Sequence, residues 1–243
     1  MKKIVSKLFK ALRLIKSRKY ISCVFHKVIP SVEHEKILNN ISNLSTIVDI
    51  GANKGQFAAI SRIIFPISQI YSFEPLERPA KIFVNAFKND KLTSFFNYAI
   101  GQSSKKVPMH ISKKEDSSSI LPISSLQSSY FPGTEEEQQK EIEVRPLDTL
   151  ITVKELVKPV LLKIDVQGYE LEVLKGCKSL LNSFNYIYVE CSFVELYEGQ
   201  ALSHQVIEYL QCKNFYLTGV FNVFYDKKGK AIQGDFMFEK LVK

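Results

Sequence analysis

The stretch VDIGANKGQF, at residues 48–57, decides the fold class. It completes a short apolar run over residues 46–50, and a helical pattern follows it over residues 56–65. A buried strand, a glycine turn and a helix in this order open a βαβ unit. In a dinucleotide-binding loop, GxGxxG, the second glycine lets the backbone approach a pyrophosphate. Asn53 holds that position here, which favours a ligand with no phosphate to bind.

The same alternation continues along the chain. Strands are expected at 69–74, 92–100, 160–165 and 186–191, and helices at 77–88, 148–157, 169–181 and 203–212. Such alternation predicts a parallel sheet. The segments 215–225 and 235–241 predict an antiparallel hairpin. Residues 102–146 interrupt the pattern with strand-like pieces at 106–111 and 141–145, which we interpret as a small β insertion with a flexible lid. The predicted fold is an α/β class I (Rossmann-like) methyltransferase fold, with a mostly parallel seven-stranded sheet.

Charge is unevenly distributed along the chain. The net charge is +8, yet residues 1–20 hold eight bases and no acid, so the other residues carry 25 bases and 25 acids. A nucleic-acid reader would more often spread its bases over a folded face. We therefore divide the chain into a basic amphipathic helical extension, residues 1–40, and a neutral catalytic domain, residues 41–243, that binds no nucleic acid.

The first 20 residues have helical periodicity. Seven apolar side chains fall on one arc and most bases on the other: Ile4, Val5, Leu8, Phe9, Ala11, Leu12 and Ile15. Bases interrupt every apolar run, so neither a signal peptide nor a transmembrane helix is expected. The segment is predicted either to lie on an anionic membrane surface or to pack its apolar arc on protein. The expected location is cytoplasmic, with peripheral contact to the inner face of the membrane in the first case.

Five residues around the first glycine loop predict a nucleoside ligand such as S-adenosylmethionine. Asp49 is expected to accept hydrogen bonds from the ligand's ammonium, directly or through water. The turn formed by Gly51, Asn53 and Gly55 is expected to bind the carboxylate with backbone N–H groups. Glu74, 23 residues after Gly51 at the end of the next strand, is expected to accept hydrogen bonds from ribose hydroxyls.

A second motif, LLKIDVQGYELEVLKG at residues 161–176, makes the chain resemble the FkbM family of methyltransferases. The matching stretches are VDIGANKG (48–55), SFEP (72–75), NYAIG (97–101), RPLDTL (145–150) and KIDVQGYELEVLKG (163–176). The resemblance covers roughly residues 40–240. The family often has Glu at the position of Gln167. The resemblance implies a class I fold, S-adenosylmethionine as donor and O-methylation, with hydroxyls of sugars in glycans or glycolipids among the acceptors.

Methyl transfer to an aliphatic hydroxyl needs a base, because the hydroxyl is a poor nucleophile until its proton begins to leave. Asp165, at a strand end, is the first candidate, Glu190 the second and His204 the third. Asp165 has two other interpretations, binding of the donor ammonium or capping of the following helix. Lys163 is expected only to pair with an acid.

Other polar residues carry weaker expectations. Pro75, Tyr98, Ala99 and Ser118, with Ser119 beside it, are expected on the donor or acceptor side of the site. His26, His34 and His110 are interpreted as surface or core histidines. Asp165 and Glu190 alone make no recognisable set of metal ligands, so no metal site is predicted.

Two alternatives remain open at the level of sequence. One is a nicotinamide-dependent oxidoreductase, against which Asn53 is the discriminating feature. The other is a non-catalytic partner subunit of a glycan-assembly complex, against which the intact Asp49, Gly51, Gly55 and Glu74 speak. The acceptor's identity and the oligomeric state do not follow from the sequence.

Overall fold

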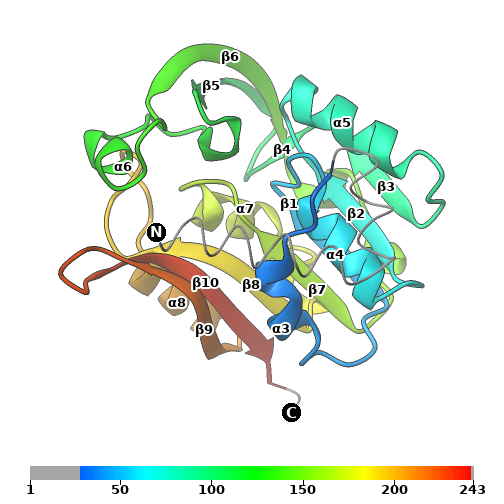
Figure 1. The fold of residues 1–243 in the computed structure, drawn as a ribbon. Helices are drawn as coiled ribbons and strands as arrows, with labels where there is room; N and C mark the ends of the chain where they lie inside the picture. The colour runs from blue at the N-terminus through cyan, green and yellow to red at the C-terminus, as the bar shows by residue number, and fades with distance from the viewer. Residues whose placement is uncertain (1–27, 242–243) are drawn as a thin grey trace.

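The computed structural model describes residues 28–241, which form a seven-stranded sheet with helices on both faces (Figure 1). The order along the sheet is β3-β2-β1-β7-β8-β10-β9. The strands are β1 (Thr46–Ile50), β2 (Gln69–Phe73), β3 (Thr93–Phe96), β7 (Val160–Ile164), β8 (Tyr186–Ser192), β9 (Phe215–Tyr225) and β10 (Ala231–Lys240). All neighbours pair in parallel except β10, which is antiparallel to β8 and β9. The predicted class I methyltransferase fold is confirmed.

The centre of the sheet lies between β1 and β7, where the strand order reverses. Every residue of both strands is buried, as their apolar runs predict for parallel strands covered on two faces. The register pairs Asp49 with Lys163 across this junction. Ligands of open α/β sheets bind outside the carboxyl ends of strands at such a switch point.

Two groups of helices cover the sheet. On one face lie η1 (Val32–His34), α3 (Glu35–Leu38), α4 (Gln56–Ile64) and α5 (Glu77–Phe87), which share a core with Ile47, Ile70 and Leu161. On the other lie η3 (Leu147–Thr149), η4 (Val153–Glu155), α7 (Glu170–Gly176), η5 (Leu181–Ser183) and α8 (Ser203–Gln211). No helix in the described range is long and apolar enough to cross a membrane. The predicted helix over residues 1–20 lies outside the described residues.

The β insertion forms a second sheet in the order β4-β6-β5. It contains β4 (Ala99–Ile100), β5 (Lys105–Ser112) and β6 (Glu136–Arg145), with η2 (Glu115–Ser117) and α6 (Ser125–Tyr130) between β5 and β6. Figure 1 shows this unit, in green, on the side of α7 opposite β10. Its own apolar cluster includes Met109, Ile142 and Val144, so the insertion is an ordered structure with a small core.

Several predicted elements were wrong in their extent, including the strands expected at 141–145 and 235–241, which are β6 (Glu136–Arg145) and β10 (Ala231–Lys240). The strand expected at 92–100 is divided into β3 and β4, because the Asn97 side chain donates to the carbonyls of Glu74 and Pro75 at 2.8 and 3.0 Å. The helix expected at 148–157 is two 3-10 turns, because Thr152 is extended and its N–H donates to Glu155. The helix expected at 169–181 covers only residues 170–176.

Candidate active site

A cavity of about 850 Å³ lies at the carboxyl ends of the central strands. Its volume is within the range of small-molecule sites. Eight of the predicted donor-binding residues line it: Gly51, Asn53, Glu74, Pro75, Tyr98, Ala99, Ser118 and Asp165. The insertion contributes one wall, and residues before β1 contribute another. The glycine loop and the second motif therefore meet in one place.

Asp49 is buried beneath this cavity and does not line it, which corrects its expected direct contact with a ligand ammonium. Its Oδ1 lies 3.1 Å from Lys163 Nζ, which also donates to the Gly51 carbonyl at 3.0 Å. Burial alone would lower the pKa of Lys163, but Asp49 and Asp165 raise it above its ordinary value. The predicted pairing of Lys163 with an acid is confirmed, and the pair fixes the base of the glycine loop.

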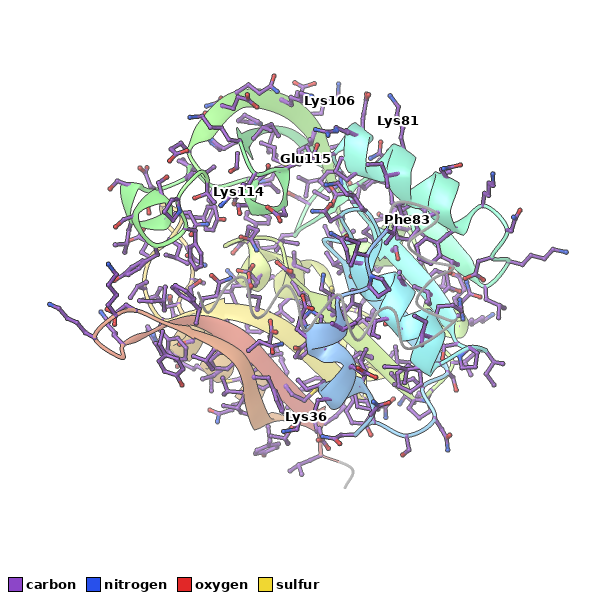
Figure 2. All side chains as sticks on the ribbon, in the orientation of Figure 1. Lys36, Lys81, Phe83, Lys106, Lys114 and Glu115 are labelled. Atoms are coloured by element: carbon purple, nitrogen blue, oxygen red, sulfur yellow. The ribbon has the colours of Figure 1, made fainter. Side chains whose placement is uncertain are left out.

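Glycine is required in the loop for two different contacts. A Cβ on Gly51, where φ is +78°, would lie 1.8 Å from the Asp165 carbonyl oxygen. A Cβ on Gly55 would meet the rings of Phe83 and Phe87 on α5, so Gly55 lets two helices pack and does not line the cavity. Figure 2 labels Phe83 on that helix. Gly55 therefore contributes to the site through helix packing.

Glu74 ends β2 with its carboxylate held beside the loop. One oxygen accepts the N–H of Asn53 at 3.0 Å, and the other accepts the N–H of Leu76 at 2.8 Å. Burial raises the pKa of Glu74 to about 7. A fixed carboxylate at this strand end is the arrangement that accepts hydrogen bonds from ribose hydroxyls.

Gln167, in the wall of the cavity, joins Asp165, which also lines it, to Glu190, which does not. Its amide nitrogen donates to Asp165 at 2.8 Å and to Glu190 at 2.7 Å, while its amide oxygen accepts from Tyr197 at 2.7 Å. Its carbonyl accepts from the Ser119 hydroxyl, which places Ser119 as a support of this turn. A glutamate at residue 167 would replace the bridging donor with a third carboxyl group.

The three candidate bases differ in their access to the cavity. Asp165 lines it, and its side chain is 39% exposed. Glu190 lies behind Gln167 and is not part of the lining, and burial raises its pKa well above the ordinary value. His204 is exposed on α8 and lies outside the cavity. The structure therefore brings only Asp165 of these three to the ligand space.

Glu170 holds the turn before α7, and Asp165 does not cap this helix. Glu170 Oε1 accepts the N–H groups of Val166 and Gly168 at 3.3 and 2.9 Å, whereas α7 has no side-chain cap from Asp165. Burial raises the pKa of Glu170 to about 7. The charge of Asp165 is thus left for the cavity.

The raised pKa of Glu170 predicts a pH-dependent stability. The pKa of Glu170 is higher in the folded state than its unfolded value of about 4.5. Its contribution to the free energy of unfolding is therefore complete below pH 4.5 and is lost as pH rises through about 7. Glu170→Gln keeps the Oε1 acceptor and removes the titration. We expect the free energy of unfolding of the variant, relative to that of wild type, to increase by at most about 3 kcal/mol between pH 5 and pH 8, as measured by urea unfolding. An equal difference in unfolding free energy at the two pH values would contradict this.

Sequence reasoning missed most residues of two cavity walls, although it expected a lid from the insertion and Ser118 in the site. Ser31, Glu33 and His34 line it from the segment before β1. The insertion adds a second set: Met109, Lys114, Glu115, Asp116, Ser117, Ile120, Gln127, Phe131 and Thr134. Neither set belongs to a recognisable motif, so only the folded chain assembles them.

Glu115 connects the insertion to the rest of the site. Its Oε2 lies 3.7 Å from Lys54 Nζ in the glycine loop and 4.0 Å from Arg78 on α5. Figure 2 shows Glu115 and Lys114 on the insertion. These contacts bring the insertion over the end of the glycine loop.

The charges of the lining favour a cationic ligand. Among the lining residues that the structure describes, acids are in excess, with Glu33, Glu74, Glu115, Asp116 and Asp165 against Lys114 and Lys163. An ammonium and a sulfonium would be attracted to such a lining, whereas a pyrophosphate would be repelled. The residues present therefore fit S-adenosylmethionine better than a dinucleotide. Within residues 28–241, no cluster of three or more His, Cys, Asp or Glu side chains has the form of a metal site.

The known proteins to which this chain is similar include several methyltransferases. The methyltransferase FkbM domain matches residues 49–217. The 2-O-methyltransferase NoeI of Sinorhizobium fredii is 30% identical over 171 residues, which are 68% of this chain and 70% of NoeI. The hexuronic acid methyltransferase AglP of Haloferax volcanii is 29% identical over 143 residues, 58% of this chain and 54% of AglP. Among solved structures, an rRNA methylase from Streptococcus thermophilus has a TM-score of 0.48 and 11% identity, covering 86% of this chain and 94% of that one.

Proposed function

Because the chain belongs to the FkbM family of methyltransferases, and is therefore a methyltransferase, we propose that it methylates a sugar hydroxyl of a glycan or glycolipid with S-adenosylmethionine as donor. The acid-lined cavity at the β1/β7 switch point carries this proposal. NoeI and AglP, which are named for 2-O-methylation and for methylation of a hexuronic acid, support the acceptor class. Neither an oxidoreductase nor a non-catalytic subunit is favoured by the lining or by these relatives.

We assign the donor to the glycine-loop side of the cavity. S-adenosylmethionine supplies an activated methyl group on a sulfonium. Glu74 accepts hydrogen bonds from the ribose, and the loop around Asn53 binds the carboxylate end. Asp165 takes the role first expected of Asp49 and accepts the ammonium, because it is the acid that reaches the cavity beside Gly51. Tyr98, Ala99 and Ser118 line the space toward the insertion, which acts as a lid.

Asp165→Asn tests the assignment of the ammonium site. A charged hydrogen bond contributes about 1.5–3 kcal/mol, and the partial exposure of Asp165 places the loss near the lower end. We expect the Kd for S-adenosylhomocysteine to rise roughly 10-fold by calorimetry, with kcat at saturating donor within about threefold of wild type. The matched control is Asp116→Asn, an exposed acid on the insertion wall, which should change Kd much less. A 100-fold fall in kcat at unchanged Kd would instead make Asp165 the base.

The proposed function is tested by transfer of labelled methyl from S-adenosylmethionine to a panel of acceptors. The panel contains free sugars, nucleotide sugars, lipid-linked glycans and, as the negative arm, RNA. We expect a base-stable methyl ether on one of the first three classes. Transfer to RNA alone, or to none of the classes by a protein that binds the donor, would contradict the proposal.

We further propose that residues 1–20 bind an anionic membrane surface, which places the enzyme at the cytoplasmic side near a lipid-linked acceptor. Eight bases close to acidic headgroups would each contribute about 1 kcal/mol. Full-length protein should sediment with anionic vesicles and not with neutral ones, and should be released at high salt. A variant lacking residues 1–20 should remain folded and lose this binding. Unfolding or a changed oligomeric state of that variant would show that the segment packs on protein.

A further inference from the structure

His34 lies at the end of η1, before the first residue of the FkbM match, and lines the cavity. Its ring makes edge contacts with Phe57, at the start of α4, and with Tyr188 on β8, with 5.5 Å between ring centroids in each case. The side chain is 16% exposed. Figure 1 shows α3, which continues from η1, beside β8 and β10. The imidazole is therefore held in place while one side reaches the ligand space.

A chain of hydrogen bonds runs from His34 into the sheet. Its Nδ1 lies 2.9 Å from the Tyr188 hydroxyl oxygen, and that hydroxyl donates to Asp235 Oδ2 at 2.8 Å. Asn222 donates to the same carboxylate oxygen at 2.8 Å and fixes its position. When Asp235 is ionised, it receives the one proton of the Tyr188 hydroxyl, and Nδ1 of His34 then carries a proton and donates to the hydroxyl oxygen. The neutral ring then has its lone pair on Nε2, for which no residue in the range 28–241 provides a hydrogen bond.

We propose that His34 is the catalytic base, which removes the proton of the acceptor hydroxyl through Nε2, and that Tyr188 and Asp235 are its positioning residues. The inference rests on the proposed function and supplies the base that Asp165, occupied with the donor, does not. The arrangement follows the logic of a base whose second nitrogen is oriented by a buried carboxylate, here through an intervening hydroxyl.

The charges around His34 suit a base at neutral pH. Burial lowers the pKa of His34 below 6.5, so the ring is neutral and able to accept a proton at pH 7. The charged or titratable groups that face it come from β1, β7, β8, β10 and its own turn: Asp49, Lys163, Asp165, Tyr188, Asp235 and Glu33. After proton uptake, the imidazolium is stabilised by Asp235 Oδ2, 3.6 Å from Nδ1.

The step balances without a further reactant. The acceptor oxygen forms a bond to the methyl carbon as the bond from carbon to sulfur breaks, and that electron pair stays on sulfur. The hydroxyl proton passes to Nε2, so the ring becomes cationic while the sulfonium charge disappears. Nε2 releases the proton to water after the methyl ether leaves.

Activity measurements separate His34 from its neighbours. We expect His34→Gln to lower kcat by about 10²–10⁴-fold with donor Kd within threefold of wild type. The substitution should also remove the fall of kcat/KM at acid pH, which in the wild type has its midpoint below pH 6.5. Tyr188→Phe keeps the ring packing and should lower kcat roughly 10-fold, the effect of one hydrogen bond. Tyr216→Phe, which removes an exposed hydroxyl on β9, is the matched control.

A measurement without turnover tests the same inference. Long-range proton–nitrogen NMR spectra of histidine-labelled protein should show His34 in the Nδ1–H form, and Tyr188→Phe should shift that balance. An Nε2–H form in wild type, or a His34→Gln variant that is folded, binds donor and retains wild-type kcat, would overturn the inference. A wild type that binds no donor would overturn the proposed function instead, and the NMR result would still decide the tautomer.

Discussion

Lys163→Met is expected to lower the free energy of unfolding by about 3–5 kcal/mol at pH 7, the usual cost of leaving one buried charge without its partner. Asp49 is inaccessible to water, and its carboxylate faces the Lys163 ammonium at 3.1 Å. The variant also loses the hydrogen bond to the Gly51 carbonyl. Urea unfolding measures the change. The deficit should shrink as pH falls from 7, because burial raises the pKa of Asp49 and the unpaired carboxyl group takes up a proton in the folded state.

Two comparisons show whether the effect comes from the unpaired charge. Asp49→Asn combined with Lys163→Met removes both charges and should recover most of the lost stability. Lys175→Met breaks an ion pair on α7 that is about one-third exposed, and should cost less than about 1 kcal/mol. If the double variant is no more stable than Lys163→Met alone, the buried charge is not the cause.

Gly51→Ala is expected to raise the Kd for S-adenosylhomocysteine roughly 5- to 100-fold. The added Cβ would lie 1.8 Å from the Asp165 carbonyl oxygen, so the ends of β1 and β7 must move apart. Overpacking of this kind costs about 1–3 kcal/mol, and each 1.4 kcal/mol lost from binding is tenfold in Kd. Calorimetry on the folded variant gives the change directly.

Gly229→Ala is the matched control for this substitution. Its φ of +83° resembles that of Gly51, but a Cβ there would meet nothing within 4 Å. The control carries the same backbone cost, about 1–2 kcal/mol for an L residue in the left-handed region, and should bind donor as wild type does. Equal losses of affinity in both variants would mean that a general loss of stability, and not the geometry of the loop, weakens binding.

The fold could be predicted because its signals are local. Apolar runs that end at Gly51 and Asp165, each followed by a helix, predict the strands at the centre of the sheet and the switch point between them. One error, the undivided strand expected at 92–100, appeared where a distant contact decides the structure. The division of the strand at Asn97 depends on carbonyls of Glu74 and Pro75, which are more than 20 residues away in sequence.

The candidate site was predicted only in part, because contacts between residues far apart in the sequence decide the rest of it. The motifs placed Glu74 and Asp165 at strand ends, where the structure has them. They did not indicate that Asp49 forms an ion pair with Lys163 beneath the cavity, because this pair depends on the register between β1 and β7. His34 carried no signal at all, because its hydrogen-bond partners lie more than 150 residues later in the sequence. Glycine patterns and strand ends predict a donor site, whereas the proposed base and acceptor walls depend on the assembled chain.

Calorimetric titration of the wild-type protein with S-adenosylhomocysteine and with NAD⁺, under the same conditions, tests the central claim most directly. The acid-rich lining and the Asn53 loop predict saturable binding of S-adenosylhomocysteine at one site per chain and no binding of NAD⁺. Binding of NAD⁺ in preference to S-adenosylhomocysteine, or no binding of S-adenosylhomocysteine by the folded protein, would contradict the account.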